Sequence, residues 1–475
     1  MLFSSIIFLI AFLPAVLVGH LIAPKPVRNV FLLLASLLFY AWGEVYYVFL
    51  MIVSILLNYG IGMGLNIAGT NQTKKWILGI GITANVALLV YYKYAAFLYD
   101  MIVQPFSSND ATTQLDIHLP IGISFFTFQS ISYLIDVYRK EVPAQKNPVS
   151  LGLFISLFPQ LIAGPIVRYS SIARELSERT MSIPLFSTGI QRFVIGLSKK
   201  VLLANPLALM ADQIFATPIE DVSSPVAWLG IICYTLQIYY DFSGYSDMAI
   251  GLGKMLGFHF LENFNFPYIA RSIQDFWRRW HISLSSWFRD YLYIPLGGNR
   301  KGPYRTYFNL FFVFFITGLW HGANWNFIFW GLFHGCFLVL ERVGFNRILN
   351  KLWAPFAHLY TLLVVIIAWV FFRIENLDEA FQFVGKLFGM NASGSYDLTP
   401  YYFANYLNII VLIVGILGST KLFHIVPAYF NRLPQQNMLK IGYQLTQAVL
   451  IFAILAMCMS ELASDTYNPF IYYRF

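Results

Sequence analysis

Long apolar runs separated by short polar connections dominate the pattern of this chain. A spanning helix needs about 20 mainly apolar residues, and runs near that length recur throughout the sequence. We therefore expect an all-α, polytopic transmembrane protein, with one membrane domain over residues 1–475. The pattern predicts about 12 spans, some short or interrupted by Gly and Pro, near residues 3–23, 28–43, 45–66, 75–99, 119–138, 188–213, 225–246, 305–320, 324–341, 353–372, 403–424 and 441–460.

The distribution of Lys and Arg predicts which connections stay in the cytoplasm. Basic residues lie in the connections near 25–28, 74–75 and 139–146. The connection over 100–118 instead carries Asp110 and Asp116 and no Lys or Arg. We expect the basic connections inside and the acidic one outside.

Residues 148–167 break this alternation. They are apolar enough to enter the membrane, but Lys146 precedes them and Arg168 and Arg174 follow, so both flanks favour the cytoplasm. A re-entrant pair, bent at 158–160 or at 163–165, reconciles these signals. Non-helical backbone at that depth requires surrounding protein or a water-filled cavity.

The longest stretch without a span runs from about Lys254 to Arg305 and is rich in Arg, Trp and Phe. A loop at the lipid headgroups explains the charge but not the aromatic density. We expect interfacial or partly inserted helices here.

Composition supports the membrane class and limits the functions. Hydrophobic residues make up 58% of the chain and charged ones 11%, against about 25% charged in soluble domains. The net charge of +8 therefore indicates topology and gives no support for nucleic-acid binding. Cys233, Cys336 and Cys458 have no paired spacing, so neither disulfides nor a Cys-based metal site is predicted.

Two histidines carry the candidate chemistry. His321 lies between Trp320 and Trp325 inside an apolar region, and His281 follows Trp280 in the basic aromatic stretch. An ionisable side chain at membrane depth is costly and is a functional candidate by default. The alternative is a structural histidine that is hydrogen-bonded to a nearby carbonyl.

Four motifs resemble those of the membrane-bound O-acyltransferases, most closely the bacterial branch of alginate O-acetylases and peptidoglycan O-acetyltransferases. These motifs lie at 241–249 (DFSGYSDMA), 277–285 (WRRWHISLS), 291–300 (YLYIPLGGNR) and 318–322 (GLWHG). The resemblance implies that the spans, re-entrant segment and interfacial helices surround a central tunnel. It also implies that His321 and His281 are the catalytic positions.

The chemistry of acyl transfer suits these residues. Transfer from a thioester to a hydroxyl requires removal of the hydroxyl proton, and a neutral imidazole with an ordinary pKa of about 6.5 does this near physiological pH. We expect His321 to be the general base. His281 is expected to orient the donor or to stabilise developing negative charge.

The resemblance further implies a cytoplasmic acetyl donor, acetyl-CoA, with no permanently bound cofactor. Arginine suits phosphate geometry, so the candidate contacts for the CoA phosphates are Arg278, Arg279, Arg289, Arg300 and Lys301. A solvated positive-inside loop is the alternative for these charges. Asp241 and Asp247 lack further oxygen ligands nearby, so no metal site is expected, and we expect them to pair with basic residues or cap backbone.

The implied product is an O-acetylated cell-surface or exported polysaccharide, reached through an SGNH-type extracytoplasmic partner, by a protein of the bacterial inner membrane. The sequence alone does not identify the polymer. A D-alanyl transferase that uses a carrier-protein thioester is an alternative within the enzyme class. A polytopic transporter or flippase is an alternative from another class, but such proteins commonly contain internal repeats, and none is visible here.

Overall fold

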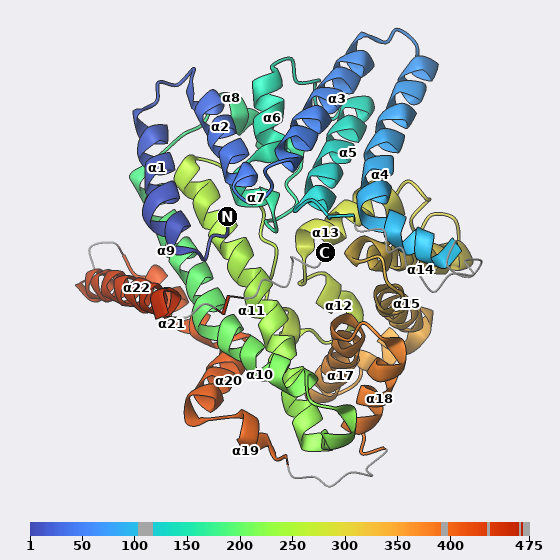
Figure 1. Cartoon of the computed structure of the whole chain (residues 1–475), viewed down its shortest axis with the longest axis vertical. Coiled ribbons are helices and arrows are strands. Elements are labelled where there is room, and N and C mark those ends of the chain that lie inside the picture. The colour runs from blue at the N-terminus through green and yellow to red at the C-terminus, as the bar shows by residue number, and fades with distance from the viewer. Residues whose placement is uncertain (103–116, 391–397, 435–437, 465–466, 469–475) are drawn as a thin grey trace. The chain divides into compact units, whose positions relative to one another are not determined.

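The computed structural model describes residues 1–102, 117–390, 398–434, 438–464 and 467–468 (Figure 1). Within these ranges every regular element is a helix, which confirms the all-α class. Asp110 and Asp116, which support the outward assignment of the 100–118 connection, lie outside the described residues.

Contacts divide the chain into two compact units. The first unit comprises Met1–Phe193 with Ala249–Leu261, and the second comprises Val194–Met248 with Glu262–Arg474. Two long helices, α9 (Ile183–Ser198) and α11 (Ser224–Leu256), contribute residues to both. The single membrane domain over residues 1–475 stays a prediction.

The first unit is a bundle in which α3, α4 and α5 pack side by side (Figure 1). Its core is aromatic at one end, where the buried rings of Phe8, Phe12 and Phe39 contact one another. Besides α9 and the end of α11, its helices are η1 (Phe8–Phe12), α1 (Leu13–Ile22), α2 (Arg28–Ala41), α3 (Tyr47–Ile67), α4 (Asn71–Ile102), α5 (Ile123–Arg139), α6 (Pro148–Ser156), α7 (Phe158–Leu161) and α8 (Tyr169–Ser177).

The segment 148–167 is a broken, almost wholly buried pair of short helices. Helix α6 ends at Ser156, and Leu157 adopts a non-helical conformation, with φ −54° and ψ 112°, before α7 begins. Buried polar partners compensate for the break: Ser36 Oγ accepts from Phe158 N at 3.1 Å, and Gln160 Nε2 donates to Phe154 O at 2.5 Å. The expected bent backbone enclosed by protein is thus present, and its entry into a membrane stays a prediction.

The second unit contains both candidate histidines. Its helices α12, α15 and α17 contact one another (Figure 1). Besides α11, its elements are η3 (Lys199–Ala204), α10 (Asn205–Phe215), η4 (Ile219–Asp221), η5 (Pro267–Ile269), α12 (Ile273–Trp277), α13 (Ile282–Phe288), η6 (Arg289–Tyr293), α14 (Pro303–His321), α15 (Trp325–Leu340), η7 (Glu341–Phe345), α16 (Asn346–Leu349), α17 (Ala354–Arg373), α18 (Leu377–Leu387), α19 (Pro400–Phe403), α20 (Tyr406–Gly418), η8 (Leu422–His424), α21 (Ile425–Asn431) and α22 (Met438–Ser464).

The stretch from Lys254 to Arg305 folds into short helical pieces, as expected. Several of its aromatic side chains, however, face the interior of the protein: Phe276 is fully buried, and Trp277, Trp280 and Trp287 are at most 7% exposed. They form part of the core of the second unit. The aromatic density therefore reflects packing around the site, which a headgroup loop would not need.

Helices occupy all of the predicted span positions. Within the described ranges, six of them are long and apolar enough to cross a membrane: Tyr47–Ile67, Asn71–Ile102, Ile183–Phe215, Trp325–Leu349, Ala354–Arg373 and Met438–Ser464. The polytopic character follows from these, and the exact number of spans stays a prediction.

Candidate active site

Hydrogen bonds to Asn263, eighteen residues earlier in the chain, hold the backbone around His281. The backbone carbonyl of Asn263 accepts from Ile282 N at 2.9 Å. Its side-chain Oδ1 accepts from Ser283 N at 3.2 Å and from Ser283 Oγ at 2.9 Å. These bonds hold His281 in a left-handed conformation, with φ 44° and ψ 55°, at the start of α13. Such a conformation is uncommon outside glycine and persists only where the surroundings impose it.

The same contacts define the proton arrangement of the His281 ring. Nδ1 lies 3.1 Å from Asn263 Oδ1, an acceptor, so Nδ1 carries the proton and Nε2 has the lone pair. His281 is fully buried, and burial lowers its pKa to about 3. No hydrogen-bond partner of Nε2 is present among the described residues. In this neutral ring, Nε2 can accept a hydrogen bond or a proton but has none to donate.

His321 is the last residue of α14, and its placement depends on close packing between α14 and α15. A Cβ added at Gly318 would lie 2.4 Å from Phe327 O, and one added at Gly331 would lie 2.3 Å from Phe314 O. Only glycine permits this approach of the two backbones. It brings His321 against Trp330, the residue before Gly331.

Aromatic rings enclose His321. Its ring lies edge-on to Trp330 at 4.9 Å and to Phe372 of α17 at 5.3 Å, and it is 3% exposed. Trp320 joins the two histidines, with ring centroids 5.0 Å from His321 and 6.3 Å from His281. The structure therefore brings together the two residues that the sequence proposed, 40 positions apart, in one buried cluster.

A third histidine, His334, belongs to the same cluster and was not predicted from the sequence. Its ring lies 5.1 Å from Trp330 and stacks on Phe276 at 6.3 Å. Trp277 Nε1 donates to His334 Nδ1 at 3.4 Å, so in the neutral ring the proton is on Nε2. His334 thus packs on the face of the site that α12 and α15 share. The His334 ring also contacts Trp330, which packs against the His321 ring.

The basic residues proposed for the CoA phosphates are not all available. Arg279 Nε donates to Asp275 at 2.9 Å, and Arg289 makes two bonds to Asp290 at 2.7 and 3.0 Å. Both guanidiniums are therefore already paired with neighbouring acids. The remaining candidates, Arg278, Arg300 and Lys301, are exposed. Contact of any of the five with phosphate stays a prediction.

Asp241 and Asp247 of α11 form ion pairs, as expected for acids in this position. Lys200 Nζ lies 2.6 Å from Asp241, and Lys199 Nζ lies 2.7 Å from Asp247. The close backbone approach that permits these ion pairs also requires glycine. A Cβ added at Gly196 of α9 would lie 2.6 Å from the carbonyl oxygen of Gly244 in α11. These acids support the packing of η3 on α11.

Comparison with known proteins supports the family resemblance of the sequence. The sequence profile of the MBOAT, membrane-bound O-acyltransferase family matches residues 72–377, a range that includes His281, His321 and His334. The probable alginate O-acetylase of Pseudomonas putida is 41% identical to this chain over the full length of both proteins. The peptidoglycan O-acetyltransferase of Helicobacter pylori is 38% identical over 82% of this chain and 80% of its own. The teichoic acid D-alanyltransferase of Bacillus subtilis is 29% identical over 53% of this chain and 66% of its own.

A polytopic helical protein with buried imidazoles in an aromatic cluster has the features of a membrane acyltransferase. The chain belongs to the membrane-bound O-acyltransferase family. It is accordingly a membrane-bound, multi-pass O-acyltransferase, as the motifs in its sequence indicated.

Proposed function

We propose that this protein transfers an acetyl group from acetyl-CoA in the cytoplasm to a hydroxyl on the other side of the bacterial inner membrane, for O-acetylation of an exported polysaccharide. The observation that carries the proposal is the buried pair His281 and His321 joined by Trp320. The proposal is further supported by full-length relatives whose names are those of O-acetylases. Alginate and peptidoglycan, the polymers in those names, are the first acceptors to test.

In the proposed reaction, His321 is the general base. It takes the hydroxyl proton as the hydroxyl oxygen attacks the thioester carbonyl carbon. The carbon–sulfur bond then breaks, and the thiolate leaves with the proton from His321. The surrounding rings of Trp330 and Phe372 exclude water, which favours transfer over hydrolysis.

His281 has a supporting role in this proposal. Its Nε2 lone pair suits an N–H or O–H donor on a substrate, such as an amide of the pantetheine arm. This supports the orienting role over the stabilisation of negative charge, because the neutral ring has no Nε2 proton to offer.

An extracytoplasmic partner of the SGNH type completes the proposal. Both histidines are at most 3% exposed, so a bulky polymer has poor access to them. A single serine on a docked partner is a smaller acceptor. The partner would then pass the acetyl group to the polymer.

Proteoliposomes test the whole proposal. With acetyl-CoA enclosed and the purified protein inserted, we expect slow thioester hydrolysis alone and polymer acetylation after the partner is added outside. Rapid acetylation of free polysaccharide without a partner would overturn the relay. Consumption of a D-alanyl carrier-protein thioester in place of acetyl-CoA would favour the teichoic acid reaction, and consumption of neither would reject acyl transfer from these donors.

A further inference from the structure

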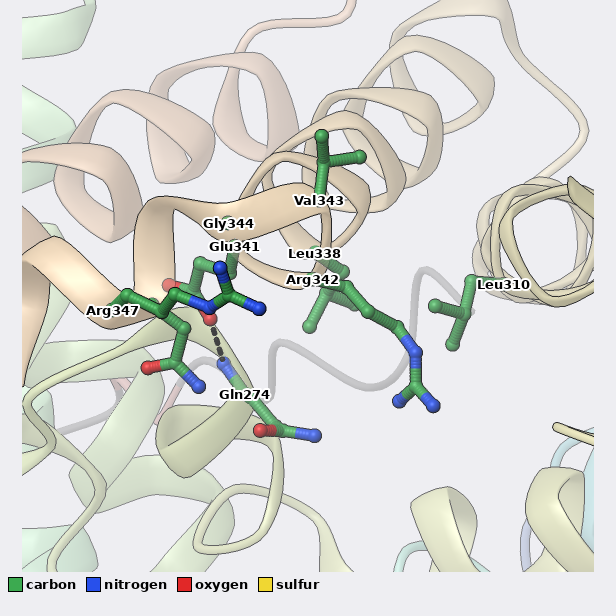
Figure 2. A pocket seen from close by; sticks show the side chains of 9 residues that line it. Gln274, Leu310, Leu338, Glu341, Arg342, Val343, Gly344 and Arg347 are labelled. Atoms are coloured by element: carbon green, nitrogen blue, oxygen red, sulfur yellow. Dashed lines mark hydrogen bonds between the residues drawn. The ribbon is translucent and has the colours of Figure 1, made fainter. Parts of the chain in front are cut away.

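A cavity of about 210 Å³ lies in the second unit, where α15 ends (Figure 2). Residues of α12, α14, η7 and α16 also line it, and three of the polar ones are Gln274, Arg342 and Arg347. Helices α14 and α15 form a hairpin, so this end of α15 lies near the start of α14 at Pro303. The positive-inside pattern predicts that this end faces the cytoplasm.

The two arginines at this cavity differ from Arg279 and Arg289. Within the described parts of the chain, no carboxylate forms an ion pair with Arg342 or Arg347, and both side chains are exposed. Figure 2 shows Arg342 and Gln274 reaching into the same space from separate elements. Unpaired guanidiniums and an amide are suitable donors for phosphate oxygens.

The one acid in the lining does not neutralise these arginines. Glu341 is 2% exposed, and its carboxylate accepts from Ile273 N at 2.6 Å, from Gln274 N at 3.0 Å and from Tyr360 Oη at 3.3 Å. Its oxygens are therefore directed at the start of α12. This contact fixes α12, which carries Trp277, the partner of His334.

The backbone at Gly344 breaks the helix between the two arginines. Its φ of 158° and ψ of −16° are non-helical, and η7 is kinked at this residue. The chain turns here and returns Arg347 to the cavity that Arg342 lines. A continuous α-helix would place residues five apart in different directions around its axis.

The cavity also lies at a distance from the histidines that the pantetheine arm of the donor can span. Trp330, which contacts His321, precedes Arg342 by twelve residues, or roughly 18 Å along the helix at 1.5 Å per residue. An extended pantetheine arm has a comparable length. Leu338, which lines the cavity, is one helical turn from His334.

We propose that the cavity lined by Gln274, Arg342 and Arg347 binds the phosphate groups of the thioester donor, with its arm extending along α15 toward Trp330 and His321. This inference rests on the proposed donor, acetyl-CoA. It assigns phosphate binding to two arginines outside the basic aromatic stretch, together with Gln274 within it.

Two donors distinguish phosphate binding from a structural role. Acetyl-CoA carries the phosphates, and S-acetyl-N-acetylcysteamine retains only the end of the pantetheine arm. Thiol release would be measured for Arg342→Gln and Arg347→Gln, with Lys351→Gln as a control that removes the same charge from an exposed position nearby. We expect each arginine variant to raise KM for acetyl-CoA by about tenfold, the loss of one charge-assisted bond. The rates with the short donor and in the control should be unchanged.

An unchanged KM for acetyl-CoA would overturn the inference, and so would equal losses with both donors. Calorimetric binding of CoA separates this inference from the proposed function. If the wild-type protein binds CoA, and Arg342→Gln weakens that binding, the phosphate site stands even when no acetyl-CoA is consumed. If CoA does not bind to the wild-type protein, the phosphate site is rejected.

Discussion

His281 and His321 are almost equally buried, yet the protein holds them in different ways. His281 lies in a left-handed turn whose hydrogen bonds converge on Asn263. His321 ends a helix and is positioned by glycine packing and by the edges of Trp330 and Phe372. Hydrogen bonds fix which nitrogen of His281 is protonated. Ring packing instead encloses His321 between Trp330 and Phe372.

The largest effect should follow from substitution of His321. We expect His321→Gln to reduce acetyl transfer by at least about a hundredfold, the contribution of a positioned general base. The yield and melting temperature should stay near wild type. Thiol release from acetyl-CoA would be measured in detergent and in proteoliposomes.

His358 offers a matched control for that experiment. Its Nδ1 lies 3.0 Å from Ala270 O, the arrangement of a structural histidine. His358→Gln should therefore retain most of the activity. Near-normal turnover in His321→Gln would remove His321 from the role of base.

A smaller effect is expected for Asn263→Ala, which tests the polar half of the comparison. The change removes the acceptor of three hydrogen bonds and leaves buried donors unsatisfied, at a cost of about 1–3 kcal/mol in stability. Turnover should fall by about tenfold because the His281 ring is no longer oriented. Asn263→Asp, which keeps the acceptor oxygen, should lose less. A fully active Asn263→Ala protein would show that the turn does not position His281.

The last prediction concerns the pH dependence of stability and involves no change in turnover. His281 lies outside the six candidate spans, and its pKa in the folded protein is about 3 against an ordinary value of about 6.5. Between these values the unfolded chain binds the proton and the folded chain does not, so stability falls as the pH falls through this window. The slope contributed by this one group is at most about 1.4 kcal/mol per pH unit.

Melting temperatures measured from pH 7 to pH 4 would check this dependence. His281→Asn, which has no titrating ring, should lose less stability in acid than the wild-type protein does. Parallel curves for the two proteins would mean that His281 is protonated as easily in the folded state as in the unfolded state.

The sequence predicts the helices well because long apolar runs and Lys and Arg positions are local signals. It also indicates His321 and His281, since a histidine in an apolar region is costly. The pairing of Arg279 with Asp275 and of Arg289 with Asp290 was not predicted, although these partners lie only four residues or one residue apart.

Other parts of the site depend on contacts that no local pattern reveals. Asn263 is eighteen residues before His281, in a segment without periodicity, and only the folded turn brings the two together. His334 lies among Phe, Trp and Leu residues of a span and belongs to none of the motifs that carry the resemblance. Only the fold brings Trp277, from a distant segment, beside it.

The ion pairs between η3 and α11 have a consequence for the biogenesis of the protein. Lys199 and Lys200 are synthesised before Asp241 and Asp247, the acids that neutralise them. A lone charged residue at the centre of an inserting helix costs about 2.5–3.5 kcal/mol. The segment 183–215 therefore cannot settle stably at its final depth until α11 has left the ribosome, and the two segments should leave the insertion machinery as a pair.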